Sequence, residues 1–271
     1  MNKLAQLRDF YENEFYEFEC ARERDLDIFT QSRYRILDKL IPKDSINKSW
    51  LDVGCGFGDT LKILEYHGCY PLFGIDLSSK SLHHVKDKTS CQLLLQADAA
   101  LLPFKDKSIH GVMASELIEH TLDWKNVIGE ICRIAQKWVI VSFPTDYDWL
   151  YTRLGIFKNP YINLTFDDAI KNHVGHISIP RLNDVRKVLK ANGFMIYKIR
   201  GFYSILPPPF KLNFHYPDLH GLSKLLYDIA AKVDHSVSWL IPFRLIGLST
   251  IIIAKQHIET NKKDSKISNR R

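Results

Sequence analysis

The apolar residues of the chain follow two different periods, and each period predicts its own kind of element. Apolar side chains three or four residues apart indicate helices, whereas short apolar runs bounded by glycine or proline indicate buried strands. Helices are predicted over about 3–40, 58–67, 122–136 and 181–192, with another from Ser78. Strands are predicted at 50–54, 70–76, 91–97, 109–115, 138–143, from 194, and at 250–254. This alternation predicts an α/β fold in which a doubly wound, mainly parallel seven-stranded sheet carries helices on both faces.

The first predicted strand ends in a glycine-rich turn that runs directly into a helix. Gly54, Gly56 and Gly58 lack a Cβ, so a ligand can lie against bare backbone there. The helix that follows offers unpaired N–H groups and the positive end of its dipole to a polar ligand. Asp76 ends the second strand 22 residues beyond Gly54, and an acid at this distance can accept hydrogen bonds from ribose hydroxyls. The turn and the acid together predict a nucleoside-cofactor site.

The spacing of the glycines narrows the choice of cofactor. A dinucleotide fingerprint reads G-x-G-x-x-G, because its third glycine lets the helix pack beside a pyrophosphate. Here the spacing is G-x-G-x-G, and an acid, Asp52, precedes it. A carboxylate so near the turn would repel a pyrophosphate, but it suits a cofactor that carries an ammonium group and a sulfonium. The pattern therefore favours a sulfonium cofactor.

On these residues the chain resembles the class I S-adenosylmethionine (SAM) methyltransferases, and most closely their type 11 group, which includes quinone-biosynthesis enzymes. Four further motifs match in order, at 74–78, 96–99, 102–104 and 116–120. The resemblance covers about residues 30–200. It implies a Rossmann-like fold with a reversed last strand, SAM as cofactor and S-adenosylhomocysteine as product.

The resemblance also assigns roles to individual residues. The expected cofactor-binding residues are Asp52, Gly54, Cys55, Gly56 and Gly58 at the methionine moiety, Asp76 at the ribose, Leu77, Asp98 and Ala99 at the adenine, and Ser115 and Glu116 near the sulfonium. Purely structural interpretations stay open beside these roles. The glycines could form only a tight turn, Asp76 could cap a helix, and Asp98 could be a solvated loop acid. Cys55 is interpreted as a small turn residue and not as a nucleophile.

A second group of residues, glutamates and histidines, could take part in the methyl transfer itself. An activated sulfonium methyl mainly needs alignment with its acceptor. A hydroxyl acceptor must also lose its proton, which a side-chain base can remove or a metal can release by lowering the hydroxyl pKa. Glu116, Glu119 and His120 are spaced to share one face of a helical turn, and His176 follows later. This pattern is similar to metal-assisted O-methyltransferases of the ubiquinone pathway and of small-RNA 3′ ends. The same turn is common in type 11 enzymes without metal. His120 is the candidate catalytic base or substrate contact. A divalent metal on Glu116, Glu119, His120 or His176 stays open without being favoured.

The chain is predicted to be organised around one large domain. Residues 1–40 are expected to form a helical cap, 41–256 the methyltransferase domain, and 257–271 a basic disordered tail. Two segments, 144–180 and 203–244, depart from the minimal domain and are interpreted as substrate or lid insertions. Ligands in such sheets bind beyond the carboxyl ends of the strands, and the segment at 144–180 starts from that rim.

Composition adds limits on partners and location. The formal charge is +6, and part of this excess lies in the basic tail. No basic stripe with interleaved aromatics marks a nucleic-acid surface, so DNA is excluded as a leading partner and RNA is disfavoured. The five scattered cysteines fit reduced thiols. The N-terminal segment lacks the apolar core of a signal peptide, and the ten-residue apolar run at 245–254 is too short to span a bilayer. We therefore expect a cytoplasmic protein, with peripheral membrane contact and oligomeric state left open.

The leading functional prediction is a SAM-dependent methyltransferase that acts on a small molecule. The expected acceptor is an oxygen or carbon atom of a quinone, lipid or sugar precursor. Two alternatives stay open: a metal-assisted RNA 2′-O-methyltransferase, and a SAM-binding regulatory protein without turnover.

Overall fold

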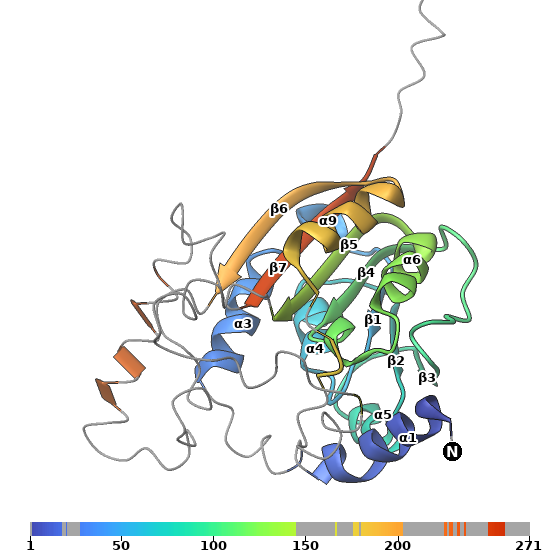
Figure 1. Cartoon of the computed structure of the whole chain (residues 1–271). Coiled ribbons are helices and arrows are strands. Elements are labelled where there is room, and N and C mark those ends of the chain that lie inside the picture. Colours follow the sequence, from blue (N-terminus) through green and yellow to red (C-terminus); the bar gives the residue numbers. More distant parts are fainter. Residues whose placement is uncertain are drawn as a thin grey trace, which may run out of the picture.

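The computed structural model describes residues 2–17, 20, 28–144, 166, 176–178, 180–202, 225–226, 228–229, 232–233, 236 and 249–257. Its helices are α1 (Lys3–Phe10), η1 (Tyr11–Phe15), α3 (Ile28–Asp38), η2 (Lys43–Ser45), α4 (Asp59–Tyr66), α5 (Ser79–Lys86), η3 (Ile118–His120), α6 (Trp124–Ile134) and α9 (Leu182–Ala191). Its strands are β1 (Trp50–Val53), β2 (Leu72–Asp76), β3 (Leu93–Gln96), β4 (Ile109–Ser115), β5 (Ala135–Pro144), β6 (Phe194–Phe202) and β7 (Ser249–Gln256). The predicted strands are all present, with shifted ends (Figure 1).

The seven strands form one sheet in the order β3-β2-β1-β4-β5-β7-β6. Strands β1 to β5 pair in parallel, and β7 lies antiparallel between β5 and β6. The predicted doubly wound, mainly parallel sheet is therefore confirmed, and so is the reversed last strand. The chain order reverses between β1 and β4, and in open α/β sheets a ligand binds beyond the carboxyl ends of the strands at this point.

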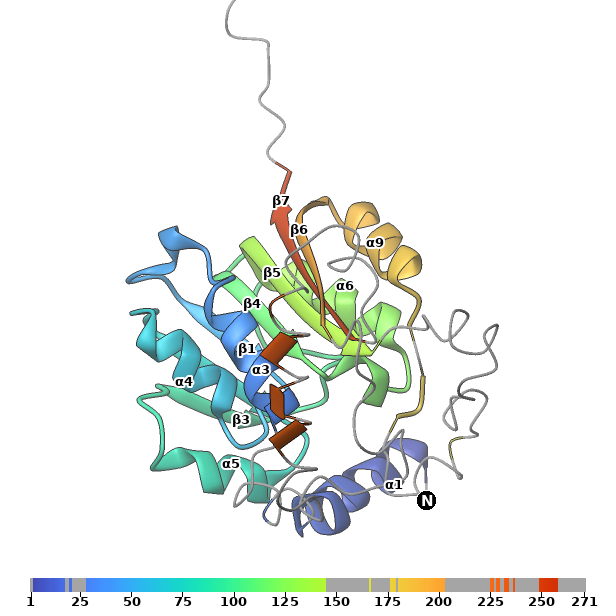
Figure 2. The same ribbon diagram turned by 90° about the vertical axis from the view of Figure 1, so that its left-hand side faces the viewer.

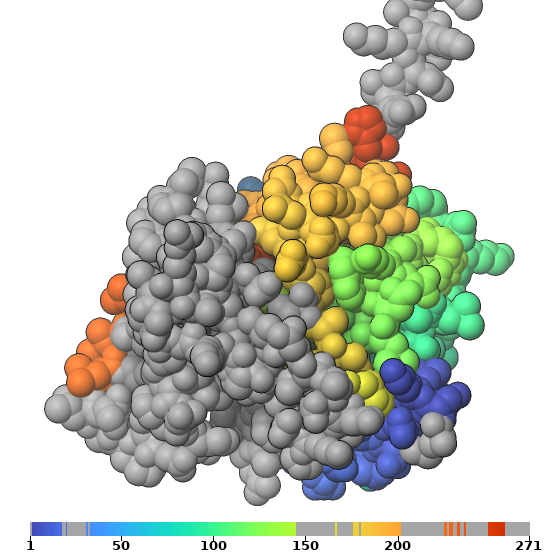
Figure 3. All heavy atoms as spheres, viewed as in Figure 1, coloured from blue at the N-terminus to red at the C-terminus, as the bar shows by residue number. Residues whose placement is uncertain are grey.

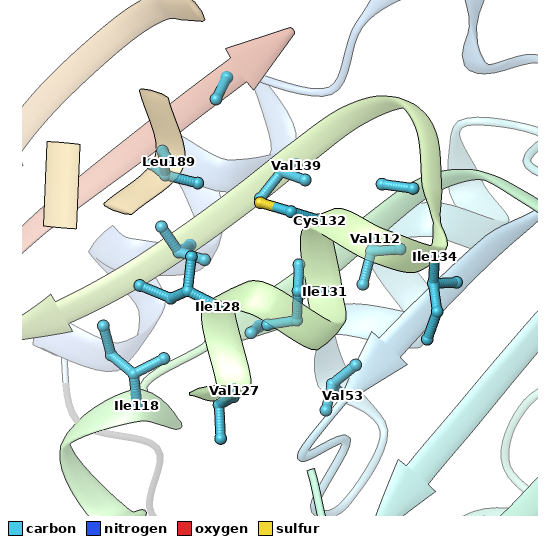
Figure 4. Packing of buried hydrophobic residues seen from close by; sticks show 14 of the residues in the cluster. Val53, Val112, Ile118, Val127, Ile128, Ile131, Cys132, Ile134, Val139 and Leu189 are labelled. Atoms are coloured by element: carbon cyan, nitrogen blue, oxygen red, sulfur yellow. The ribbon is translucent and has the colours of Figure 1, made fainter. Parts of the chain in front are cut away.

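Helices cover both faces of the sheet, and each presents an apolar stripe to it (Figure 2). On one face, α6 and α9 bury a large cluster against the sheet, in which Ile128 and Ile131 lie near Val112 and Val139 (Figure 4). On the other face, residues of α3 and α4 pack around Trp50. Helix α6 begins where its N-cap residue, Asp123, accepts hydrogen bonds from two backbone N–H groups of the first turn.

The boundary between α6 and β5 differs from the prediction. The helix was predicted to about residue 136, but it ends at Ile134, and β5 already begins at Ala135. Ala135 has extended dihedrals, φ −69° and ψ 126°, which end the helix without a loop. The chain changes from helix to strand between Ile134 and Ala135, where no glycine or proline marks the boundary in the sequence.

The N-terminal helix lies apart from the two helical layers, beside α5 at one end of the molecule (Figures 1 and 2). Leu7 and Phe10 on its inner side are buried. Residues 21–27 of the predicted cap, most of the 144–180 and 203–244 segments, and the tail from 258 lie outside the described residues. In the described part of the chain, no helix combines the length and apolar character needed to cross a membrane.

Candidate active site

The glycine-rich turn joins β1 to α4 and is fixed against the neighbouring strand. The N–H groups of Gly54 and Cys55 both donate to the carbonyl oxygen of Ile75, at 2.8 and 2.9 Å. Gly54, Gly56 and Gly58 have φ values of +71°, +48° and +84°, a region that side chains with a Cβ enter only with strain. The turn therefore requires glycine at all three positions for backbone reasons alone.

The three glycines differ in what surrounds them. A Cβ at Gly54 would lie 2.7 Å from Leu117 Cδ1, and one at Gly58 would lie 3.0 Å from Val85 Cγ1. A Cβ at Gly56 would meet no atom within 4 Å. Gly54 and Gly58 thus allow close packing within the protein, whereas the bare backbone of Gly56 faces open space.

That open space is a cavity of about 310 Å³ beyond the carboxyl ends of β1, β2 and β4, which falls at the lower end of the usual range for small-molecule sites, roughly 300–1,000 Å³. The predicted site residues among its lining are Gly54, Gly56, Asp76, Leu77, Asp98, Ala99, Glu116 and His120. Leu4, Leu7, Tyr11 and Phe15 close it from the N-terminal side. In the space-filling view this N-terminal segment (blue) adjoins the green region around α6 (Figure 3), and residues 121–123 before α6 also line the cavity.

Asp76 is the acid at the centre of this wall. Its Oδ2 accepts the Gly56 N–H at 2.8 Å, and its Oδ1 accepts the Ser78 N–H at 2.9 Å. Burial raises the pKa of the Asp76 carboxyl, and its backbone donors act against this rise. The bonds orient both oxygens at the end of β2. Ser78 itself is the N-cap of α5, so the capping role considered for Asp76 belongs to its neighbour.

Asp98 and Ala99 lie on the loop after β3, next to Leu77 in the cavity wall. Oδ1 of Asp98 accepts the Ala100 N–H at 2.9 Å, which fixes the carboxylate in a local turn. This acid therefore shapes its loop and also borders the cavity.

Four predicted cofactor residues lie behind the cavity wall. Asp52 is fully buried and accepts a hydrogen bond from the Thr60 hydroxyl, while its Oδ1 has no hydrogen-bond partner in the described part of the chain. The pKa of Asp52 is raised to about 7, mainly by burial, while the Thr60 hydrogen bond lowers it and the carboxylates of Asp76 and Asp59 add to the rise. Cys55 is buried in an apolar cluster, and burial raises its thiol pKa.

The third of these residues is Ser115. Its hydroxyl lies 3.0 Å from the Ser142 hydroxyl of the adjacent strand β5, and it does not line the cavity. Gly58 is likewise set back from the cavity, at the N-cap of α4. The sequence located the turn that borders the cavity, but it could not separate residues that face the cavity from those that support it.

The expectation that Glu116, Glu119 and His120 share one helical face is wrong. Glu116 has a φ of +52°, so the chain leaves β4 in a left-handed conformation, and the short helix η3 begins only at Ile118. The carboxylate of Glu116 accepts a hydrogen bond from the Ser142 hydroxyl at 2.8 Å and lies 3.8 Å from Nη1 of Arg33. Glu116 therefore lies outside η3 and does not share a helical face with Glu119.

Glu119 and His120 instead converge with His176. One ligand atom from each of the three side chains lies within 4.8 Å of the others. Glu119 is fully buried, and burial together with the charge of Glu116 raises its pKa well above 4.5. His120 also lines the cavity, where its ring packs edge-on against Tyr11 and Phe15. The sequence predicted this trio, although it also included Glu116.

Two residues near the site had no sequence signal. Arg33 reaches Glu116 from α3, more than 80 residues earlier in the chain. Glu12 of η1 accepts the N–H of Ser79 at 2.8 Å and so caps α5 from 67 residues away. Burial is the largest single influence on the Glu12 carboxyl and acts to raise its pKa. The hydrogen bonds from Ser78, Ser79 and Lys80 together outweigh burial, so the pKa is lowered. Such contacts depend on tertiary packing and leave no local pattern.

Comparisons with known proteins agree with this geometry. Residues 51–141, from β1 into β5, match the family model of the type 11 methyltransferase domain. The chain is 34% identical over 101 residues to malonyl-[acyl-carrier protein] O-methyltransferase of Hamiltonella defensa, over 37% of this chain and 39% of that protein. It is 22% identical over 155 residues to 24-methylenesterol C-methyltransferase 2 of Oryza sativa, over 55% of this chain and 41% of that protein. The chain thus spans about two fifths of the length of these two relatives.

The fold is also that of a solved methyltransferase. The crystal structure of magnesium protoporphyrin IX methyltransferase from Synechocystis PCC 6803, with bound S-adenosylhomocysteine, superposes with a TM-score of 0.60 at 14% identity. The match covers 93% of this chain and 99% of that one. Residues 51–141, from the glycine turn into the fifth strand, thus carry a methyltransferase domain of type 11, and the chain around them has the fold of that solved methyltransferase.

Proposed function

We propose that the protein transfers the methyl group of SAM to a small-molecule acceptor and that SAM occupies the 310 Å³ cavity. The observation that carries this proposal is the position of Gly56. Its backbone faces open space, and its N–H donates to the Asp76 carboxylate in the same wall. A bare backbone beside an oriented acid suits a nucleoside whose ribose and amino-acid portions lie along the turn.

The remaining wall residues suggest how SAM would lie. The ribose hydroxyls would donate to Asp76, and the adenine would lie by Leu77, Asp98 and Ala99. The methionine moiety would follow the turn past Gly56 toward Glu116. A carboxylate near the sulfonium favours the positive charge of SAM over the neutral sulfur of its product.

The acceptor would enter from the side closed by the N-terminal helix. Leu4, Leu7, Tyr11 and Phe15 give this side an apolar character, and the ring of His120 packs against Tyr11 and Phe15 there. This lining favours an acceptor with an apolar body and one reactive oxygen or carbon, as in a quinone or lipid precursor. The named relatives act on a carrier-bound malonyl group and on a sterol, so the family leaves the acceptor class open. His120 is proposed as the base or the acceptor contact.

Calorimetric titration with SAM, S-adenosylhomocysteine and NADH tests the cofactor site. Gly56→Ala adds a methyl group to the cavity wall and should weaken SAM binding by at least about 10-fold. Gly68→Ala is the matched control, because Gly68 also has a left-handed φ of +69° but lies away from the cavity. Both variants should lose about 1–2 kcal/mol of stability to backbone strain, and only Gly56→Ala should lose SAM affinity. Equal SAM affinity in the two variants would place the cofactor elsewhere.

Turnover is tested separately from binding. Purified protein, SAM and fractionated extract should release S-adenosylhomocysteine, and the active fraction should survive ribonuclease. Release that ribonuclease abolishes would favour the RNA 2′-O-methyltransferase alternative. Tight SAM binding without release from any fraction would favour the non-catalytic regulatory protein.

A further inference from the structure

Glu119 is a carboxylate buried without the partners that a buried acid normally requires. Its exposed fraction is 0%, and neither Oε1 nor Oε2 has a hydrogen-bond partner among the described residues. An ionised carboxylate in such surroundings is strongly destabilising unless a proton or a cation compensates it. Nε2 of His120 is 3.7 Å from Oε1, beyond hydrogen-bond range but close enough for both atoms to contact one ion.

His176 is held beside this pair by the backbone. The N–H groups of Ile177 and Ser178 both donate to the carbonyl oxygen of Glu119, at 2.8 and 3.1 Å. These two bonds fasten residues 176–178 onto η3, although more than 50 residues separate them in sequence. The rings of His120 and His176 consequently meet edge to face, with centroids 4.8 Å apart.

The spacing of the three side chains suits a metal ion. Their ligand atoms lie within 4.8 Å of one another. Metal–ligand bonds of about 2.0–2.2 Å place ligand atoms roughly 3–4 Å apart, so small side-chain rotations would complete the set. One carboxylate with two imidazoles matches the preference of transition metals such as Zn²⁺, Co²⁺ and Mn²⁺ more closely than that of Mg²⁺, which favours oxygen ligands.

We propose that Glu119, His120 and His176 form a three-ligand site for a divalent transition metal at the acceptor end of the cavity. Glu116 is not part of it, because its carboxylate is engaged by Ser142 and faces Arg33. A three-ligand site leaves coordination positions open. His120 lines the cavity, so an open position can face the acceptor.

This inference rests on the proposed function and narrows its acceptor to one that offers a hydroxyl oxygen. Coordination lowers the pKa of a hydroxyl, whose proton then leaves to solvent. With metal bound, His120 therefore meets the acceptor as a metal ligand and not as the base. The resulting oxygen forms a bond to the SAM methyl carbon as the carbon–sulfur bond breaks and its electron pair returns to sulfur. The products are a methyl ether and neutral S-adenosylhomocysteine, so no oxidant or reductant is needed.

The test is metal binding to the full chain after dialysis against a chelator. Titration with Co²⁺ should give one equivalent of binding and a ligand-field absorption band, and Zn²⁺ and Mn²⁺ should bind in calorimetry more tightly than Mg²⁺. Glu119→Gln and His176→Gln should each weaken binding by more than about 100-fold, since even outer partners of a metal ligand contribute 10- to 100-fold. His257→Gln is the control, because His257 is exposed and follows β7 outside the cavity.

The variants also report whether the fold survives. Glu119→Gln keeps the shape of the side chain and removes a buried acid, so it should melt at or above the temperature of metal-free wild type, and metal should raise only the wild-type melting temperature. Absence of metal binding to wild type, or equal binding to Glu119→Gln and His257→Gln, would overturn the site and leave Glu119 as a protonated acid. SAM affinity is measured on the same metal-free samples. Intact SAM binding without metal binding therefore overturns this inference alone, whereas loss of SAM binding overturns the proposed function.

Discussion

Asp52 should make the stability of the protein fall as the pH rises from 4 to 7. It lies at the end of β1 with 0% of its surface exposed, and the Thr60 hydroxyl is its hydrogen-bond donor. Burial raises its pKa from 3.8 to about 7, and the charges of Asp76 and Asp59 act in the same direction. The Asp52→Asn substitution keeps the shape of the side chain and removes its titration.

The sign of the effect follows from the proton balance. Below pH 3.8 the folded and unfolded states both carry the proton, so Asp52 adds no pH dependence there. Between pH 3.8 and about 7 the unfolded chain releases the proton while the folded protein keeps it, which lowers the free energy of unfolding. A pKa difference of this size corresponds to about 4 kcal/mol by pH 7. Above that pH both states are ionised and the contribution is constant.

The assay is urea unfolding of wild type and Asp52→Asn between pH 4 and 8. The free energy of unfolding of the variant minus that of wild type should rise by up to about 4 kcal/mol and level off near pH 7. The unpartnered amide of the variant adds an offset that does not depend on pH. Thr60→Val removes the donor that favours the ionised form, so its pH-dependent loss should extend above pH 7. A difference that stays constant, or that shrinks as the pH rises, would refute this account of Asp52.

Three further predictions concern the cavity and its surroundings. Asp76→Ala should weaken SAM binding in calorimetry by about 1–3 kcal/mol, because the ribose hydroxyls lose their acceptor, and unchanged affinity in a folded variant would contradict this role. Glu12→Gln should remove the charge that caps α5 at Ser79. The free energy of opening the N-terminal helix should fall by about 1 kcal/mol, which speeds its hydrogen exchange by about fivefold. Equal exchange in both proteins would show that this contact does not hold the helix. Gly111→Ala should destabilise the fold by about 1–3 kcal/mol, because its Cβ would lie 2.5 Å from the Trp50 ring, and an unchanged melting temperature would refute this packing.

The order of strands and helices could be predicted from the sequence because it depends on local patterns, and so could the residues of the turn that borders the cavity. The turn from Gly54 to Gly58 carries its own signature, since each position needs a left-handed φ. Asp76 is found by its distance from that turn, because both lie at carboxyl ends of adjacent parallel strands. The family model over 51–141 confirms the resemblance that these motifs indicated.

The direction in which each side chain points was not readable. Asp52 and Gly54 lie two residues apart on β1 and its turn, yet Asp52 is enclosed while Gly54 borders the cavity. The positive φ of Glu116 breaks the helical spacing on which its pairing with Glu119 depended. Contacts such as Glu12 with Ser79 join segments far apart in the chain. Each of these features is set by tertiary packing, which a local pattern does not encode.

A crystal structure with S-adenosylhomocysteine tests the central claim most directly. We predict density for the nucleoside in the cavity, with both ribose hydroxyls within hydrogen-bond distance of the Asp76 carboxylate and the amino-acid portion against the Gly56 backbone. Density for the nucleoside elsewhere, or an empty cavity at saturating ligand, would contradict the account.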